Sequence, residues 1–378
     1  MSPAFRNQVN GTRCLLGLIS RRFVFGGPRS IALLLSSECN SRCVMCWFHS
    51  PLLNTASEAG GSVLQSGISQ DPFMDYALCE TIIREAHELG TARVVLGGWG
   101  SPGLHPKLDQ ILGLLVRLRM KAYLITNGLA IDQQRARYWA ELPAHFRFSM
   151  HAGDPETWLR IHTGGSLHQF ELLEKVIQQM AGPGKAEVSI MHAIQKANFR
   201  NMREMVEHAH KMGVQNVLFL PVQAEGFIAS KVLLSKEEEN ELPGELTRAL
   251  ELAEVLGIRT NLAEYIATRR FVRDGIPDTA DLYRRIPCYI GWIYSEFHPD
   301  GTMRPCEYSQ IAIGKAGQQS IREMWHSPAY RRFRQEGRNL PLRGEEVTGC
   351  NCRKCTMAKF NLNIHSLLRL KSFRYNEA

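Results

Sequence analysis

The sequence predicts an α/β protein: a partial (β/α)6 barrel followed by a small C-terminal domain made of a β-hairpin and a helix. Six short apolar runs alternate with stretches of helical periodicity between residues 30 and 256. This alternation is typical of parallel sheets whose strands are joined by helices. Six units rather than eight favour an open barrel. After about residue 275, short strand-like segments flank a Pro-Asp-Gly turn, which indicates a hairpin.

The first predicted strand, Ser30–Ser36, is nearly continuous in apolar residues, as expected for a strand buried on both faces of a sheet. The other five strands are predicted at Arg93–Leu96, Ala122–Ile125, Phe146–Met150, Glu187–Ala193 and Asn216–Leu220. The alternating helices are predicted at Met74–Leu89, Leu108–Arg119, Gln133–Leu142, Phe170–Met180, Met202–Met212 and Lys236–Leu256. The polar stretch Asn54 to Asp71 has no apolar period and is expected to be a surface loop.

The C-terminal part is expected to hold hairpin strands at Tyr294–Phe297 and Met303–Cys306, then a helix around Ile321–Gln335. We therefore predict four parts along the chain. They are an N-terminal extension (1–29), the barrel (30–280), the hairpin and helix domain (281–360) and a C-terminal tail (361–378).

The composition is that of an ordinary globular enzyme. Of the 378 residues, 44% are hydrophobic and 22% are charged, which fits a soluble chain with a sizeable core. No uncharged apolar run approaches the roughly 18 residues that a membrane-spanning helix needs. No signal peptide is evident, so we expect a reducing, cytoplasmic setting in which grouped cysteines hold metals or catalyse reactions.

The formal net charge is +8, with denser basic stretches at Arg331–Arg338 and Lys371–Arg374. A solvated basic surface explains this pattern, and a phosphate-bearing substrate or an acidic electron donor is the alternative. No recognised nucleic-acid motif accompanies the charge, which argues against a nucleic-acid partner.

Three of the ten cysteines, Cys39, Cys43 and Cys46, form a C-x3-C-x2-C motif directly after the first strand. Three thiolates in one loop can hold three irons of a [4Fe-4S] cube and leave the fourth iron open. A closed structural site has four protein ligands, whereas a reactive site keeps an open position. The incomplete set therefore favours chemistry over scaffolding. Cys14 and Cys79 stand alone and are expected to be buried apolar residues.

A second cysteine group lies in the C-terminal part. Cys288 and Cys306 are separated by 17 residues, and Cys352 and Cys355 form a C-x2-C pair. These four predict one closed metal centre, which suits electron transfer better than substrate binding. Cys350 is an alternative ligand to Cys352. Zinc is the alternative metal, because C-x2-C pairs often bind it.

Over about residues 28–360 the chain resembles the radical S-adenosylmethionine (SAM) enzymes. The resemblance rests on Cys39-x3-Cys43-x2-Cys46 after a buried strand, with an aromatic residue, Trp47, following. It implies that SAM binds the open iron and is cleaved by one electron to methionine and a 5′-deoxyadenosyl radical, which abstracts a substrate hydrogen. It also implies a reductant partner such as flavodoxin or ferredoxin.

Further motifs of the family have counterparts here. Gly100 and Ser101 lie where the family has Gly-Gly-Glu-Pro, with serine in place of the glutamate; Asn127 belongs to a Thr-Asn-Gly run. The resemblance implies that Gly100, Ser101 and Asn127 bind the cofactor. It also implies that Ser149 lies near the SAM ribose and Arg160 near the SAM carboxylate. Ordinary turns and a surface helix arginine are the alternatives. Asn198 sits in a family-like run, or caps a helix.

The second cysteine group is similar to the SPASM/twitch extension of radical SAM enzymes, in its short form with one auxiliary [4Fe-4S] cluster. This resemblance implies a net oxidation, a dehydrogenation, in which the auxiliary cluster accepts an electron. We expect a small-molecule substrate such as a sugar or cyclitol, because the 38 residues before Cys39 are too few for a peptide-recognition domain.

Two alternatives stay open: maturation of a peptide by a SPASM-type enzyme, and a non-enzymatic zinc or electron-transfer module. The acid or base, if one is used, is not identified. Four candidates lie near predicted strand ends or the hairpin: His151, Glu225, Tyr294 and Glu296. For each of them a structural role is the alternative.

Overall fold

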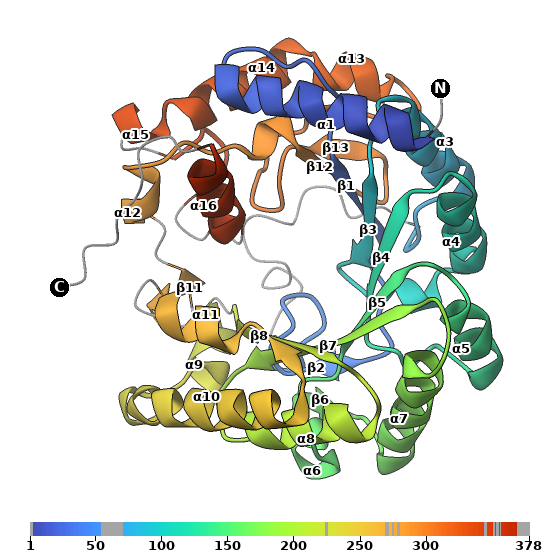
Figure 1. Ribbon diagram of the computed structural model, residues 1–378, viewed down its shortest axis with the longest axis vertical. Coiled ribbons are helices and arrows are strands. Elements are labelled where there is room, and N and C mark those ends of the chain that lie inside the picture. Colours follow the sequence, from blue (N-terminus) through green and yellow to red (C-terminus); the bar gives the residue numbers. More distant parts are fainter. Residues whose placement is uncertain are drawn as a thin grey trace. The chain divides into compact units, whose positions relative to one another are not determined.

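The computed structural model describes residues 3–53, 71–223, 226–268, 272–273, 276–277, 280–343, 346–350, 352, 355 and 357–368 (Figure 1). It contains a large, mostly parallel sheet and many helices, which confirms the predicted α/β class. Most of the predicted loop (54–70), Glu225 and the basic stretch 371–374 lie outside the described residues.

The chain divides into two compact units. The first consists of Met1–Leu33, Asp75–Val94 and Pro277–Ala378, and the second of Leu34–Met74 and Val95–Ile276. Strands β1 (Ser30–Ser36) and β3 (Arg93–Gly98) begin in the first unit and end in the second. The second unit therefore receives the C-terminal ends of these strands, where parallel α/β folds place their sites.

All six predicted strands are present within a few residues of the expected bounds. Five of them follow the order β3-β4-β5-β7-β8 in the sheet, with the two-residue strand β9 (Arg259–Thr260) added at the edge. The pairs from β4 to β9 are parallel. The remaining bounds are β4 Lys121–Thr126, β5 His145–Ser149, β7 Glu187–Ile194 and β8 Asn216–Pro221.

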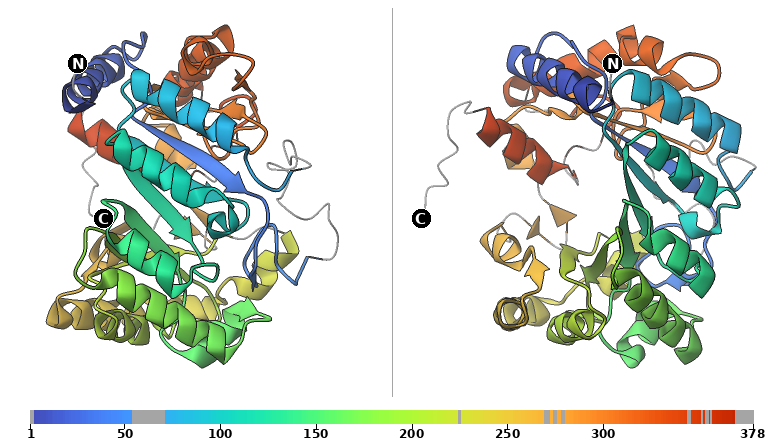
Figure 2. Two further views of the ribbon diagram at one scale, coloured as in Figure 1. Left: turned by 90° about the vertical axis from the view of Figure 1, so that its right-hand side faces the viewer. Right: turned by 45° about the vertical axis from the view of Figure 1, so that its right-hand side comes forward.

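The six predicted helices are also present, and Figure 2 shows α4 and α5 lying along one face of the strands of their unit. They are α3 Tyr76–Glu88, α4 Leu108–Arg117, α5 Gln133–Ala140, α7 Leu167–Ala181, α8 Met202–Lys211 and α10 Lys236–Leu256. The ends of α10 show why the sequence could place it. Ser235 and Glu238 form a capping box at its start, and Gly257 ends it in the left-handed region at φ 67°.

The first unit contains the predicted hairpin, β12 (Tyr294–Phe297) paired antiparallel with β13 (Thr302–Arg304). Strand β12 also pairs in parallel with β1, with Ser30 opposite Tyr294. The single helix predicted over 321–335 is two helices, α13 (Ile321–Trp325) and α14 (Pro328–Arg338). Ser327 caps α14, and a proline at the first helical position starts a helix rather than continuing one.

The predicted N-terminal extension contains a helix that the sequence did not predict, α1 (Pro3–Ser20). Its buried Asn10 donates to the carbonyl oxygens of Gly27 (3.3 Å) and Gly90 (2.8 Å), which fixes the helix to two other segments of the first unit. Across the described residues, no helix has both the length and the apolar character that crossing a membrane requires.

Candidate functional site

The cysteine loop follows β1 and is folded by its own short-range hydrogen bonds. The Cys46 amide donates to the carbonyl of Cys43 (3.0 Å), and the Ser50 hydroxyl donates to the carbonyl of Val44 (2.6 Å). The Cys46 sulfur accepts the backbone N–H groups of Phe48 (3.4 Å) and His49 (3.3 Å). Donors aimed at a sulfur stabilise its thiolate form, so this loop suits metal ligation.

Two residues predicted from separate motifs meet beside the first cysteine. The Asn127 amide donates to Asn40 Oδ1 (2.9 Å) and lies 3.7 Å from Cys39 Sγ, while the buried Ser101 hydroxyl donates to Asn127 Oδ1 (3.1 Å). Ser101 therefore acts on the loop through Asn127. The contact forms because β3 and β4 both end at this edge of the sheet.

Gly100 allows the turn after β3 to approach the cysteine loop. Its amide donates to the carbonyl of Ser36 (2.9 Å), and the next amide, of Ser101, donates to the carbonyl of Glu38 (2.7 Å). A Cβ at position 100 would overlap the backbone of Glu38 well inside van der Waals contact. The glycine is thus required by a close backbone approach one residue before Cys39.

Gly100→Ala is expected to displace the cysteine loop, with a stability cost of about 1–3 kcal/mol for the overpacking. The measurement is the iron content after anaerobic reconstitution together with the thermal midpoint. Gly97→Ala is the matched control, since Gly97 lies near the end of β3, just before this turn, and a Cβ there meets nothing within 4 Å. Equal iron contents in the two variants would contradict this account of Gly100.

Ser149 and Arg160 are the other two residues that the resemblance predicts to bind SAM. Ser149 is the last residue of β5. Arg160 lies in the last turn of α6 (Pro155–Ile161), where it donates to Thr157 Oγ1 (2.9 Å), and its side chain is 58% exposed. Their contacts with SAM therefore stay predictions. Asn198 does not cap α8, because Asn201 occupies that position; it donates instead to the carbonyl of His151 (2.7 Å).

Three buried histidines lie near the ends of β5 and β7, and two of them were not singled out in the sequence. Burial lowers the pKa of His162 to about 4 and that of His192 to about 3. His151, which the sequence did mark, is buried in the left-handed region at φ 64°, and burial lowers its pKa well below the usual value. All three rings are neutral near pH 7, so this region is polar but uncharged.

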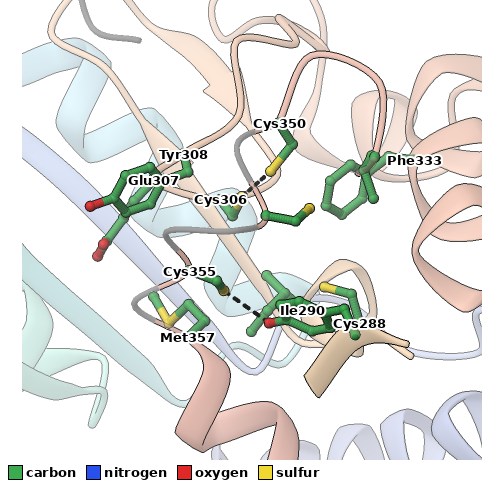
Figure 3. A pocket seen from close by; sticks show the side chains of 12 residues that line it. Cys288, Ile290, Cys306, Glu307, Tyr308, Phe333, Cys350, Cys355 and Met357 are labelled. Carbon is green, nitrogen blue, oxygen red and sulfur yellow. Dashed lines mark hydrogen bonds between the residues drawn. The ribbon is translucent and has the colours of Figure 1, made fainter. Parts of the chain in front are cut away.

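The second cysteine group lines one pocket of the first unit (Figure 3). The five cysteines there are Cys288, Cys306, Cys350, Cys352 and Cys355. The structure thus brings together all four ligands predicted for the second centre, with the alternative ligand beside them.

Electrostatic contacts and hydrogen bonds join the five cysteines of this pocket. Burial, followed by the charges of Cys355, Cys352 and Cys306, raises the pKa of Cys288 well above its usual range. Cys350 interacts with Cys306, at 3.6 Å between sulfurs, and with Cys352. Cys350 therefore lies against two of the four predicted ligands, as expected for an alternative to Cys352.

A tyrosine and an asparagine hold the last cysteine. The buried Tyr283 hydroxyl donates to Cys355 Sγ (2.9 Å), and the Asn361 amide donates to the Tyr283 oxygen (2.9 Å). Asn361 also accepts the backbone N–H of Tyr289 (2.6 Å). Hydrogen bonds to cluster sulfurs and burial are two factors that set the reduction potential of an iron–sulfur centre.

The donor sets of both regions suit iron–sulfur clusters. Among the described residues, no three Cys, His, Asp or Glu side chains already converge as a metal-ion site, and the fit therefore rests on thiol chemistry. Burial raises the pKa of the Cys43 thiol to about 12, so metal binding must displace its proton. The loop offers three thiols and the pocket five, which matches one open and one closed cluster.

Comparison with known proteins decides the family. The profile of the radical SAM superfamily matches residues 33–223, which begin within β1 and include the cysteine loop. The chain belongs to the radical SAM superfamily. An iron–sulfur cluster-binding domain of the SPASM type matches residues 288–356, the segment that contains the second cysteine group.

Relatives of this radical SAM protein include two PqqA peptide cyclases. The Granulibacter bethesdensis protein is 23% identical over 290 residues, covering 72% of each chain. The Streptomyces rochei protein is 24% identical over 349 residues, covering 87% of this chain and 85% of its own.

Solved structures of Streptococcus suis SuiB share the fold. SuiB bound to SAM is 16% identical with a TM-score of 0.62, covering 88% of this chain and 75% of that one. SuiB bound to the precursor peptide SuiA is 14% identical with a TM-score of 0.59, covering 92% and 80%. The fold and the two profiles confirm the predicted radical SAM and SPASM-type assignment, with SAM, a [4Fe-4S] cluster and an auxiliary cluster as cofactors.

Proposed function

We propose that this radical SAM protein modifies a peptide, forming a cross-link or ring between two of its residues. The observation that carries the proposal is the similarity, over most of both chains, to PqqA peptide cyclases. SuiB, which shares the fold, has been solved with a precursor peptide bound. These relatives favour the peptide alternative over the small-molecule dehydrogenation that the short segment before Cys39 led us to prefer.

Within this proposal, Cys39, Cys43 and Cys46 hold the SAM-binding cluster. Cys288, Cys306, Cys352 and Cys355 hold the auxiliary cluster. The donor types and the contacts described above support both sets. The cysteine loop leaves one iron for SAM, whereas the four thiols of the pocket leave none.

The clusters and SAM supply the difficult chemistry. With SAM and the clusters bound, one electron would cleave SAM, a peptide C–H hydrogen would end on 5′-deoxyadenosine, and a second hydrogen would leave as a proton while its electron passed to an iron–sulfur acceptor. The peptide thus loses two hydrogens as the new bond forms.

The chain's own residues position this chemistry and limit water. Asn127 and the two N–H donors to Cys46 fix the sulfurs of the loop. Phe48 stacks on the buried Trp99 with 5.5 Å between ring centroids, which provides an apolar cover next to the loop. Excluding water protects a reactive radical from side reactions. Ser149 and Arg160 are the proposed contacts to the SAM ribose and carboxylate.

The substrate class can be tested by hydrogen transfer. The reconstituted holoenzyme is incubated with SAM, a chemical reductant and either a deuterated peptide digest or a deuterated mixture of monosaccharides and cyclitols. Deuterium is expected in 5′-deoxyadenosine only from the peptides, with a modified peptide that has lost two hydrogens. Deuterium transfer from the sugars alone would contradict the proposal and restore the small-molecule prediction.

A further inference from the structure

The middle cysteine of the loop is attached to a distant part of the second unit. Strand β2 (Arg42–Cys43) pairs antiparallel with β6 (His162–Thr163), with Cys43 opposite His162. The amide of Val44 extends this ribbon by donating to the carbonyl of Ile161 (2.9 Å). The loop backbone on both sides of Cys43 is therefore held by the last residue of α6 and the segment that follows it.

The side chain of His162 contacts the sulfur itself. Its Nδ1 lies 3.3 Å from Cys43 Sγ and 3.2 Å from Ser41 Oγ, and Ser41 Oγ lies 3.3 Å from the same sulfur. On the other edge, Nε2 donates to the carbonyl of Met150 (3.1 Å), since a carbonyl can only accept. This bond fixes which ring edge faces Cys43.

The ring of His162 is also fixed by packing. It is 1% exposed and stacks on Trp158 at 4.5 Å between centroids and 21° between planes. On the same ring, His151 stacks at 5.7 Å and 16°. These two stacking contacts and the bond to a backbone carbonyl restrain the ring, so it can define where the Cys43 sulfur lies.

We propose that His162 is a positioning residue for the SAM-binding cluster: with its proton on Nε2, its Nδ1 can only accept, so it orients the Ser41 hydroxyl beside the Cys43 sulfur and, through Ser41, tunes the reduction potential of that cluster. The inference rests on the assignment of Cys43 as a cluster ligand. Outer partners of metal ligands orient them and tune the metal. In iron–sulfur proteins, hydrogen bonding and burial around the sulfurs shift the potential.

The test compares three variants in the reconstituted holoenzyme. His162→Phe keeps a flat ring for stacking but removes both nitrogens, and His162→Gln keeps an amide that can donate to Met150 and accept near Ser41. His208→Gln is the control, because His208 pairs with Glu174 on other elements of the same unit. The readouts are iron content, redox titration and electron paramagnetic resonance (EPR) of both clusters, the SAM-binding cluster being identified by the change that SAM causes in its signal.

His162→Phe is expected to shift the midpoint potential of the SAM-binding cluster and lower its reduced signal severalfold at fixed potential. The auxiliary signal should stay unchanged, and His162→Gln should restore most of the loss. Wild-type potentials and signals in His162→Phe would overturn the proposal. If His162→Phe does not fold, His162→Gln and Ser41→Ala decide: a shift confined to the SAM-binding cluster supports the role, and unchanged spectra overturn it.

The underlying ligand assignment has a separate outcome. Cys43→Ala should lose the SAM-sensitive EPR signal whatever the His162 variants do. Retention of that signal in Cys43→Ala would refute the assignment of Cys43, whereas its loss combined with unchanged His162 variants would refute only the positioning role.

Discussion

Replacing Cys43 with alanine is expected to abolish SAM cleavage. The cysteine loop has three thiols for three irons, so removing one leaves a cluster site with too few ligands to persist. We expect about eight irons per chain in the wild type to fall to about four, because the auxiliary cluster remains. The measurements are iron and sulfide content and 5′-deoxyadenosine formed after adding SAM and a reductant.

Cys79→Ala is the matched control for this experiment. Cys79 is fully buried in α3 of the first unit and belongs to neither cysteine group. It should keep all the iron and normal SAM cleavage, even if the smaller side chain costs some stability. A Cys43→Ala protein that still produced 5′-deoxyadenosine would show that the loop is not the SAM-binding site.

Replacing Cys288 with alanine is expected to separate SAM cleavage from product formation. The loop cluster is untouched, so 5′-deoxyadenosine should still form at a measurable rate. The auxiliary cluster loses a buried proposed ligand that interacts with three other cysteines. Without it the electron released from the substrate has no acceptor, and the modified peptide should fall below detection. Mass spectrometry of peptide and nucleoside products in one reaction measures both effects.

Cys350→Ala in the same pocket is the control that identifies the ligand set. Cys350 contacts Cys306 and Cys352 but is not one of the four proposed ligands, so its loss should leave the auxiliary iron and the product yield close to wild type. If Cys350→Ala loses the cluster and Cys352→Ala retains it, the two positions have exchanged roles. If Cys288→Ala makes wild-type amounts of product, the auxiliary cluster has no part in the reaction.

The regular elements of the barrel could be predicted because periodicity and end signals agreed. The helix α10 was predicted with its observed bounds, since Ser235 and Gly257 mark its ends. The helix α1 was missed. Its mixed sequence includes Gly11 and Thr12, and its position depends on contacts made by Asn10 with residues far along the chain. Tertiary contacts of this kind leave no local pattern in a sequence.

The same distinction applies to the site. Spacing alone marked Cys39, Cys43 and Cys46, because these three cysteines are close in sequence. The contact of His162 with Cys43 joins residues 119 positions apart and depends on the short pairing of β2 with β6. Two-residue strands carry no periodic signal. Ser101 and Asn127 were both predicted, but their hydrogen bond to each other could be seen only in the structure.

The first unit is built from three separate stretches of the chain, and this affects the order in which the protein can fold during its synthesis. Its late segment supplies partners for its early ones: the Trp325 indole donates to the carbonyl of Gly26 (2.8 Å), and the Ile321 amide donates to the carboxylate of Glu85 (2.6 Å). At about 5–20 residues per second, roughly 10 to 50 seconds separate the synthesis of residue 33 from that of residue 277. By the end of this interval every segment of the unit that contains the cysteine loop has been made, while Gly26 and Glu85 of the first unit still lack their partners from residues 277–378. We therefore expect the surroundings of the first three cysteines to form on the ribosome before the last cysteines have been translated.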